Sequence, residues 1–180
     1  MADPKISTDF TLRQEDSTLS GTITNISGDS GGLTRFGLCA KYHPTLVAAG
    51  FYDASMDAAT ALPLAEQTYL QDYATPLLIA EIDDQAIATA LLSFAVNEEG
   101  TGDKGTAVKL LQESCGAVPD GVIGPATIAS INELDPPYLL SRYCEAQEAH
   151  YRGIVAANPS QAEFLNGWLN RVEAVKALGG

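Results

Sequence analysis

The sequence has few basic residues: 10 lysines and arginines stand against 23 aspartates and glutamates, for a formal net charge of −13. Such a charge repels the phosphate backbone of nucleic acids and the anionic surface of lipid bilayers. No stretch approaches the roughly 20 consecutive apolar residues that a membrane-spanning helix needs. We therefore expect no nucleic-acid partner and no insertion into a membrane.

Cysteine and histidine are also scarce, and their spacing argues against a metal site. Cys39, Cys115 and Cys144 form no CxxC pair, and His43 and His150 lie far apart without ligand-like neighbours. Zinc sites typically draw on closely spaced pairs of these residues. The sequence therefore predicts no metal and no other cofactor, and the cysteines are interpreted as small core side chains.

What the sequence does contain is a series of helix signals. Apolar residues recur at helical spacing from Met56 until Pro76, from about Asp84 to Asn97 and from Lys104 to Cys115. Further helices are expected where proline follows a start signal, at residues 124–125, 135–136 and 158–159. A length of 180 residues is typical of one domain. The chain is therefore predicted to be a single, mainly α domain.

The N-terminal part departs from this helical pattern. Residues 7–9 offer N-cap oxygens for a helix that runs to about Ser17, which places Glu15 near its last turn. Residues 22–26 are short, β-branched and alternating, and a turn-prone Ser-Gly-Asp-Ser-Gly-Gly follows. We expect a small β-hairpin or loop excursion near residues 20–34.

Glu15 is the candidate for acid chemistry. A carboxyl group beside a polar loop suits glycoside hydrolysis, because that reaction needs a proton donor and a polar partner. Asp16 is adjacent, but neighbouring residues of a helix point about 100° apart. Asp29 or the Thr34 hydroxyl is therefore the expected partner. On spacing alone, a glutamate near polar loop residues is more often a solvated surface feature.

The order of these residues is more specific than their spacing. Glu15 at a helix end is followed by residues 29–38, Asp-Ser-Gly-Gly-Leu-Thr-Arg-Phe-Gly-Leu. This resembles glycoside hydrolase family 108, lysozyme-like N-acetylmuramidases whose helix ends in Glu-Gly-Gly-Tyr, followed by Asp-Pro-Gly-Gly-x-Thr-x-x-Gly-Ile. The resemblance implies a lysozyme-like fold with Glu15 as the catalytic acid and with Asp29 and Thr34 as catalytic partners.

Two later segments extend the resemblance. Residues 69–73 are similar to the Tyr-x-x-x-Tyr-Trp helix of the family, and residues 94–97 to its Asp-x-Ala-Val-Asn segment. From the resemblance we expect Tyr42, Tyr73 and Asn97 to bind the substrate.

The C-terminal part resembles the predicted peptidoglycan-binding region of the same family. The similarity covers residues 107–112, 120–127 and 164–171. The domain of residues 1–180 would then comprise a catalytic part, residues 1–100, and a helical part, residues 101–180. Two interpretations of residues 120–127 stay open: contact with the cell wall, or a plain helix-turn-helix connection. Tyr143 and Trp168 lie at helical spacing with apolar residues and are predicted to be core side chains.

The resemblance implies a bacteriolytic muramidase that cleaves the β-1,4 bond from N-acetylmuramic acid to N-acetylglucosamine, with peptidoglycan glycan strands as its partner. Residues 16–18 and Ala74 depart from the family pattern, which has Gly-Gly-Tyr and tryptophan there. These departures leave a non-catalytic wall-binding module of the same fold as an alternative. Two further alternatives stay open: a lytic transglycosylase, or a secreted antibacterial effector with an immunity protein as partner.

Residues 1–5 lack the basic and apolar regions of a secretory signal. We expect the chain to be made in the cytoplasm without a recognisable signal peptide. It would then act on the periplasmic or extracellular cell wall after export or lysis.

Overall fold

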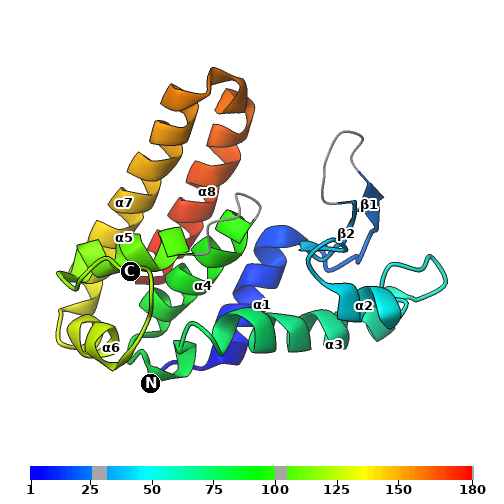
Figure 1. Cartoon of the computed structure of the whole chain (residues 1–180), viewed down its shortest axis with the longest axis horizontal. Helices are drawn as coiled ribbons and strands as arrows, with labels where there is room; N and C mark the ends of the chain where they lie inside the picture. Colours follow the sequence, from blue (N-terminus) through cyan, green and yellow to red (C-terminus); the bar gives the residue numbers. More distant parts are fainter. Residues whose placement is uncertain (26–31, 100–104, 180) are drawn as a thin grey trace.

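A computed structural model describes residues 1–25, 32–99 and 105–179 (Figure 1). The helices are α1 (Pro4–Glu15), α2 (Pro44–Ala48), α3 (Ala58–Thr68), α4 (Gln85–Glu99), α5 (Gly105–Cys115), α6 (Pro125–Asn132), α7 (Pro136–Ala157) and α8 (Leu165–Lys176). A π-helix, η1 (Tyr69–Ala74), and three 3-10 turns, η2 (Ile79–Glu81), η3 (Pro159–Phe164) and η4 (Ala177–Gly179), accompany them. The strands are β1 (Thr24–Asn25), β2 (Leu33–Arg35) and β3 (Leu38–Cys39). The predicted class, mainly α with a small β excursion, is confirmed.

The first helix begins earlier than predicted. Asp3 is its N-cap and accepts a hydrogen bond from the backbone of Lys5, while Pro4 occupies the first turn. Proline is tolerated there because the first N–H groups of a helix have no intrahelical partner. The start predicted at residues 7–9 is therefore wrong. The helix ends at Glu15, slightly before the predicted end near Ser17, and Glu15 lies in the last turn as predicted.

Helix α4 is the centre of the core and packs against α1, α5, α7 and α8 (Figure 1). Its residues 86–96 are all buried, as expected for a helix that is apolar on every side. Small polar side chains let α1 approach closely, and the hydroxyls of Ser7 and Thr89 lie 2.9 Å apart. Within the described ranges, no helix is long and apolar enough to cross a membrane.

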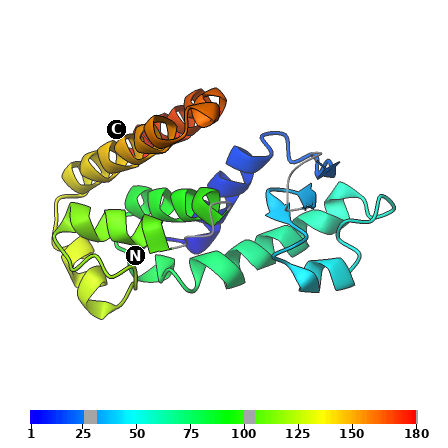
Figure 2. The same cartoon turned by 45° about the horizontal axis from the view of Figure 1, so that its top comes forward.

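Helices α7 and α8 lie side by side and form a pair next to α4 (Figures 1 and 2). The predicted caps are confirmed: Asp135 accepts from the backbone of Tyr138, and Asn158 accepts from the backbone of Ser160. The helix predicted after Asn158 differs in one respect. It opens with the 3-10 turn η3, and regular α-helix begins only at Leu165.

The segment between α5 and α6 is a turn built around a buried side chain. The Gln112 amide donates to Asp120 Oδ1 at 2.8 Å and accepts from the backbone N–H of Gly121 at 2.9 Å. Gly121 adopts a positive φ of 78°, which glycine takes without steric cost. This geometry favours the helix-turn-helix interpretation of residues 120–127.

The small sheet has the antiparallel order β1-β2-β3, with Thr24 opposite Thr34 and Thr34 opposite Cys39. The hairpin expected near residues 20–34 is therefore confirmed. Buried Arg35 anchors it, since its guanidinium donates to three backbone carbonyls, those of Gly21, Phe51 and Met56, at 2.8 to 2.9 Å. These bonds hold the sheet against the residues that lead into α3.

Candidate active site

A polar hollow of about 370 Å³ lies between the end of α1 and the sheet, and we name it the sheet hollow. Its lining consists of Glu15, Asp16, Ser17, Ser20, Thr22, Thr24, Thr34, Phe36 and Gly37. The fold thus brings together Glu15 and Thr34, two of the three predicted catalytic residues. Asp29, the third, lies outside the described residues.

The turn between β2 and β3, residues 36–37, packs against the Glu15 side chain. Gly37 has a positive φ of 76°, and a Cβ atom there would lie 2.5 Å from Glu15 Cγ and 2.7 Å from the Tyr69 hydroxyl. That hydroxyl donates to the carbonyl of Phe36 at 2.9 Å. Because glycine has no side chain, the Glu15 side chain can pack directly against the backbone at Gly37.

Asp16 also borders the sheet hollow, and its role is to shape the chain after α1. As the C-cap residue it has φ −139°, so the 100° separation of helical neighbours does not apply to it. Its Oδ2 accepts from the Gly21 N–H at 2.8 Å and from the Ser20 hydroxyl at 3.1 Å. Burial opposes ionisation, but these bonds and one from Thr18 outweigh it and hold the pKa of Asp16 below its ordinary value of 3.8.

Arg171 of α8 forms an ion pair with Glu15, with Nη2 2.7 Å from Oε1. Both side chains are largely covered, with exposed fractions of 12% and 19%. The second terminal nitrogen, Nη1, is buried, and no group of the described residues accepts a hydrogen bond from it. Sequence reasoning did not single out Arg171.

A second hollow, of about 350 Å³, lies on the α8 side of this ion pair. We name it the α8 hollow, and its lining includes Gln14, Asn97, Phe164, Gly167, Trp168 and Arg171. The predicted substrate-binding residue Asn97 is therefore placed close to the catalytic candidate. Its amide donates to the Tyr151 hydroxyl at 2.9 Å.

The two aromatic residues predicted as core differ in their environment. Tyr143 is fully buried, and its hydroxyl donates to the carbonyl of Ala107. Trp168 is only partly buried and lines the α8 hollow. Its ring stacks on Tyr151 with centroids 5.1 Å apart and an angle of 16° between the planes. Trp168 therefore packs against the core through its contact with Tyr151 and also lines the α8 hollow.

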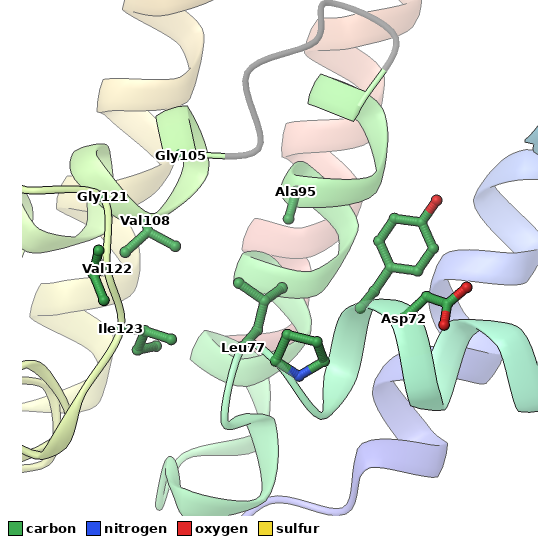
Figure 3. Close-up of a pocket in the computed structure, with 10 residues that line it drawn as sticks. Asp72, Leu77, Ala95, Gly105, Val108, Gly121, Val122 and Ile123 are labelled. Carbon is green, nitrogen blue, oxygen red and sulfur yellow. The ribbon is translucent and has the colours of Figure 1, made fainter. Parts of the chain in front are cut away.

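Tyr73, a predicted substrate-binding residue, lies outside both the sheet hollow and the α8 hollow. It is 3% exposed, it stacks on Tyr69, and its hydroxyl lies 3.3 Å from His43 Nε2. It lines an apolar pocket of about 270 Å³. In Figure 3, Leu77 and Ala95 face Val108, Val122 and Ile123 across this pocket.

Tyr42 is also placed apart from the two hollows that meet at Glu15. It is 44% exposed and carries the Lys41 ammonium 5.3 Å from the centre of its ring. Among the described lining residues of the sheet hollow and the α8 hollow, neither Tyr42 nor Tyr73 occurs. The structure thus brings Thr34 and Asn97 to the site and leaves the two tyrosines outside it.

The prediction of core cysteines fits Cys144, which is buried, and Cys115, which is partly buried and packs against the core, whereas Cys39 of β3 is only partly buried. Burial raises the pKa of the Cys144 thiol to about 11 and also raises the pKa of Cys115. In the part of the chain that the structure describes, no group of three His, Cys, Asp or Glu side chains is placed to hold a metal ion.

Similarities to known proteins cover both sides of this site. A family model described as Glycosyl hydrolase 108 matches residues 9–98, and one described as Predicted Peptidoglycan domain matches residues 106–173. The solved structure of Brucella abortus SagA is similar, with 25% sequence identity, a TM-score of 0.67 and coverage of 95% of this chain and 94% of that one. No curated protein matches significantly. Glu15 lies in the first matched region and Arg171 in the second.

Proposed function

The chain belongs to the glycosyl hydrolase 108 family, and on that premise we propose that it cleaves the β-1,4 bond between N-acetylmuramic acid and N-acetylglucosamine, with Glu15 as general acid. The family makes it a glycosidase, and the match to a predicted peptidoglycan domain makes peptidoglycan its substrate. The bond that is cleaved and the role of Glu15 are the parts that we propose.

The observation that carries the proposal is the position of Glu15. It ends α1 at the border of a polar hollow, with Gly37 behind it and Arg171 beside it. Arg171 contacts Oε1, and in the proposed mechanism Oε2 carries the transferred proton. A carboxyl group fixed at the edge of an open polar hollow is the arrangement that general acid catalysis of glycoside cleavage needs.

The proposed reaction begins when Glu15 gives its proton to the glycosidic oxygen. The bond from that oxygen to the anomeric carbon of N-acetylmuramic acid breaks, and N-acetylglucosamine leaves with a free 4-hydroxyl group. Positive charge develops at the anomeric carbon, as in other glycosidases. Water adds to this carbon and releases a proton. The carboxylate of Glu15 or that of Asp29 takes up this proton, which completes the hydrolysis.

A second group must orient the water or stabilise the charge, and Thr34 and Asp29 are our candidates. Thr34 lines the sheet hollow together with Glu15. The Thr34 hydroxyl has the chemistry to position water, whereas the Asp29 carboxylate would act as a base or stabilise the cationic centre.

We also propose that the enzyme meets its substrate in the periplasm or outside the cell, because peptidoglycan lies there. In an antibacterial effector the same chemistry would call for an immunity protein in the producing cell. Co-purification of a tight inhibitor from the producing cell would support this role, whereas lysis of that cell by the free enzyme would support an endolysin.

Mass spectrometry of the fragments released from purified sacculi tests the proposed bond. Hydrolysis predicts fragments with a reducing N-acetylmuramic acid end. Fragments with a 1,6-anhydro end would instead identify a lytic transglycosylase, and reducing N-acetylglucosamine ends would place the cut at the other glycosidic bond. Binding to sacculi without any release would identify a wall-binding module.

A further inference from the structure

The α8 hollow has features of a ligand site that the acid chemistry of Glu15 does not use. It lies outside the sheet hollow, and its aromatic residues come from the region matched by the predicted peptidoglycan domain. Three observations about its lining point to a ligand: an exposed aromatic surface, a donor without an acceptor, and its position relative to Glu15.

The aromatic surface is formed by Trp168 and Phe164. Their ring centroids are 6.0 Å apart, and Phe164 is 48% exposed. Trp168 is held in place from behind, since its ring stacks on the buried Tyr151. A rigid, partly exposed indole offers a flat apolar face at low entropic cost, and the apolar face of a pyranose ring matches such a surface.

The polar side of the α8 hollow is formed by Gln14, Asn97, Glu163 and Arg171. Arg171 Nη1 is buried and donates to no group of the described residues. An unsatisfied buried donor is costly, and a ligand oxygen that reaches Arg171 Nη1 would remove this cost. Asn97 is oriented by its bond to Tyr151, which fixes the direction of its amide. An N-acetylated sugar carries hydroxyl and acetamido oxygens that suit such donors.

The position of the α8 hollow relates it to catalysis. Glu15 lines the sheet hollow and Arg171 lines the α8 hollow, and a 2.7 Å ion pair joins these two lining residues. A glycan that occupies both hollows therefore crosses Glu15 at the junction, where its glycosidic bond is within reach of the acid.

We propose that the α8 hollow is a saccharide subsite that holds an N-acetylhexosamine ring of the glycan strand, stacked on Trp168 and contacted by Arg171. This inference rests on the proposed function, because it places the scissile bond at Glu15. It gives the C-terminal region a direct part in the catalytic groove: α8 is one wall of the groove and the sheet is the other.

The chain offers a built-in probe, because Trp168 is its single tryptophan. Peptide-free glycan strands, prepared from sacculi with an amidase, are titrated into the Glu15→Gln chain while tryptophan fluorescence is recorded. We expect a saturable change in intensity or wavelength. Unchanged fluorescence at strand concentrations that saturate binding in a sedimentation assay overturns the subsite, and so does a failure of the strands to bind.

A blocking variant tests the subsite without disturbing the core. Gly167 lies in α8 and lines the hollow, and a Cβ atom there would meet nothing within 4 Å, so we expect Gly167→Leu to narrow the hollow without a clash at Cβ. The matched control is Gly153→Leu in α7, where a Cβ atom also meets nothing within 4 Å. We expect Gly167→Leu to weaken glycan binding at least tenfold and Gly153→Leu to leave it unchanged. Equal binding by both variants contradicts the proposal.

Substitution of Trp168 itself adds a kinetic readout. In the active chain, Trp168→Ala is expected to raise KM for glycan strands about tenfold with a smaller effect on kcat, and Trp168→Phe to recover most of the loss. Tyr138→Ala, at an exposed aromatic residue of α7, is the control. These binding measurements also separate the two proposals: an active Glu15→Gln chain overturns the acid role, whereas normal binding by Gly167→Leu overturns the subsite alone.

Discussion

Arg171 and Glu15 are 156 positions apart in the sequence, and their side chains meet at 2.7 Å. The pair joins α8 to the end of α1 and so connects the two regions that match different family models. The carboxyl group that we propose as the acid is therefore oriented by a residue of the C-terminal region. In our proposal the C-terminal helices therefore contribute to the catalytic unit.

Arg171→Met is expected to lower kcat for sacculus digestion about 10- to 100-fold, because Glu15 loses the group that orients it. We also expect a loss of about 1–3 kcal/mol in the free energy of unfolding, since one partner of a largely covered ion pair is left behind. Initial rates and denaturant unfolding measure the two effects. Arg152→Met is the control, because its partner Glu148 lies 4.0 Å away and its side chain is 59% exposed. A normal rate in Arg171→Met would refute the positioning role.

Gly37→Ala is expected to lower activity by displacing Glu15, because the new methyl group would lie 2.5 Å from Glu15 Cγ. The positive φ adds a backbone penalty of about 1–2 kcal/mol. Gly32→Ala is the matched control, since its φ is 78° and a Cβ atom there meets nothing within 4 Å. Thermal unfolding should show the backbone penalty in both variants and a further loss in Gly37→Ala from the steric clash, and only Gly37→Ala should lose activity. Equal activity in the two variants would contradict this account.

Asp16→Asn is expected to destabilise the protein in a pH-dependent manner. The folded pKa of Asp16 is held below its ordinary value of 3.8, so its carboxylate contributes stability above that value. This contribution is lost as the pH falls through the folded pKa. Urea unfolding from pH 7 down to pH 3 should therefore show the largest difference from wild type near neutrality and a shrinking difference below about pH 4. A difference that stays constant over this range would show that Asp16 acts through shape alone.

Gln112→Leu is expected to cost about 2–3 kcal/mol in the free energy of unfolding, because it leaves the Gly121 N–H without its acceptor and removes the bond to Asp120. Denaturant unfolding measures this loss, with Gln67→Leu on the exposed face of α3 as control. Sedimentation with sacculi under native conditions gives a second readout. Normal stability together with weakened sedimentation would favour wall contact by residues 120–127 over a structural turn.

The elements that the sequence predicted well are those fixed by local rules. Asp135 and Asn158 each precede a proline, and both cap the helices that follow. Asp3 and Pro4 start α1 in the same way, although Ser7 and Thr8 are also residue types that commonly cap helices. In the folded chain these two residues face the core instead.

Local sequence rules do not predict the long-range contacts of the candidate site. Glu15 could be singled out from its place at a helix end, whereas Arg171 could not, because no local pattern reports a contact across 156 positions. The local pattern around Trp168 also predicts only part of its environment. Its helical spacing with apolar neighbours predicts core packing, yet a large side chain can be stacked on Tyr151 and also line a hollow.

The rate of fragment release from purified sacculi by Glu15→Gln tests the central claim most directly. The amide keeps the shape of the side chain but has no proton to donate, so we expect the rate to fall at least about 100-fold. Glu113→Gln, at an exposed position of α5, should digest sacculi at the wild-type rate, and circular dichroism should show both variants folded. Release by Glu15→Gln at the wild-type rate would contradict the assignment of Glu15 as the catalytic acid.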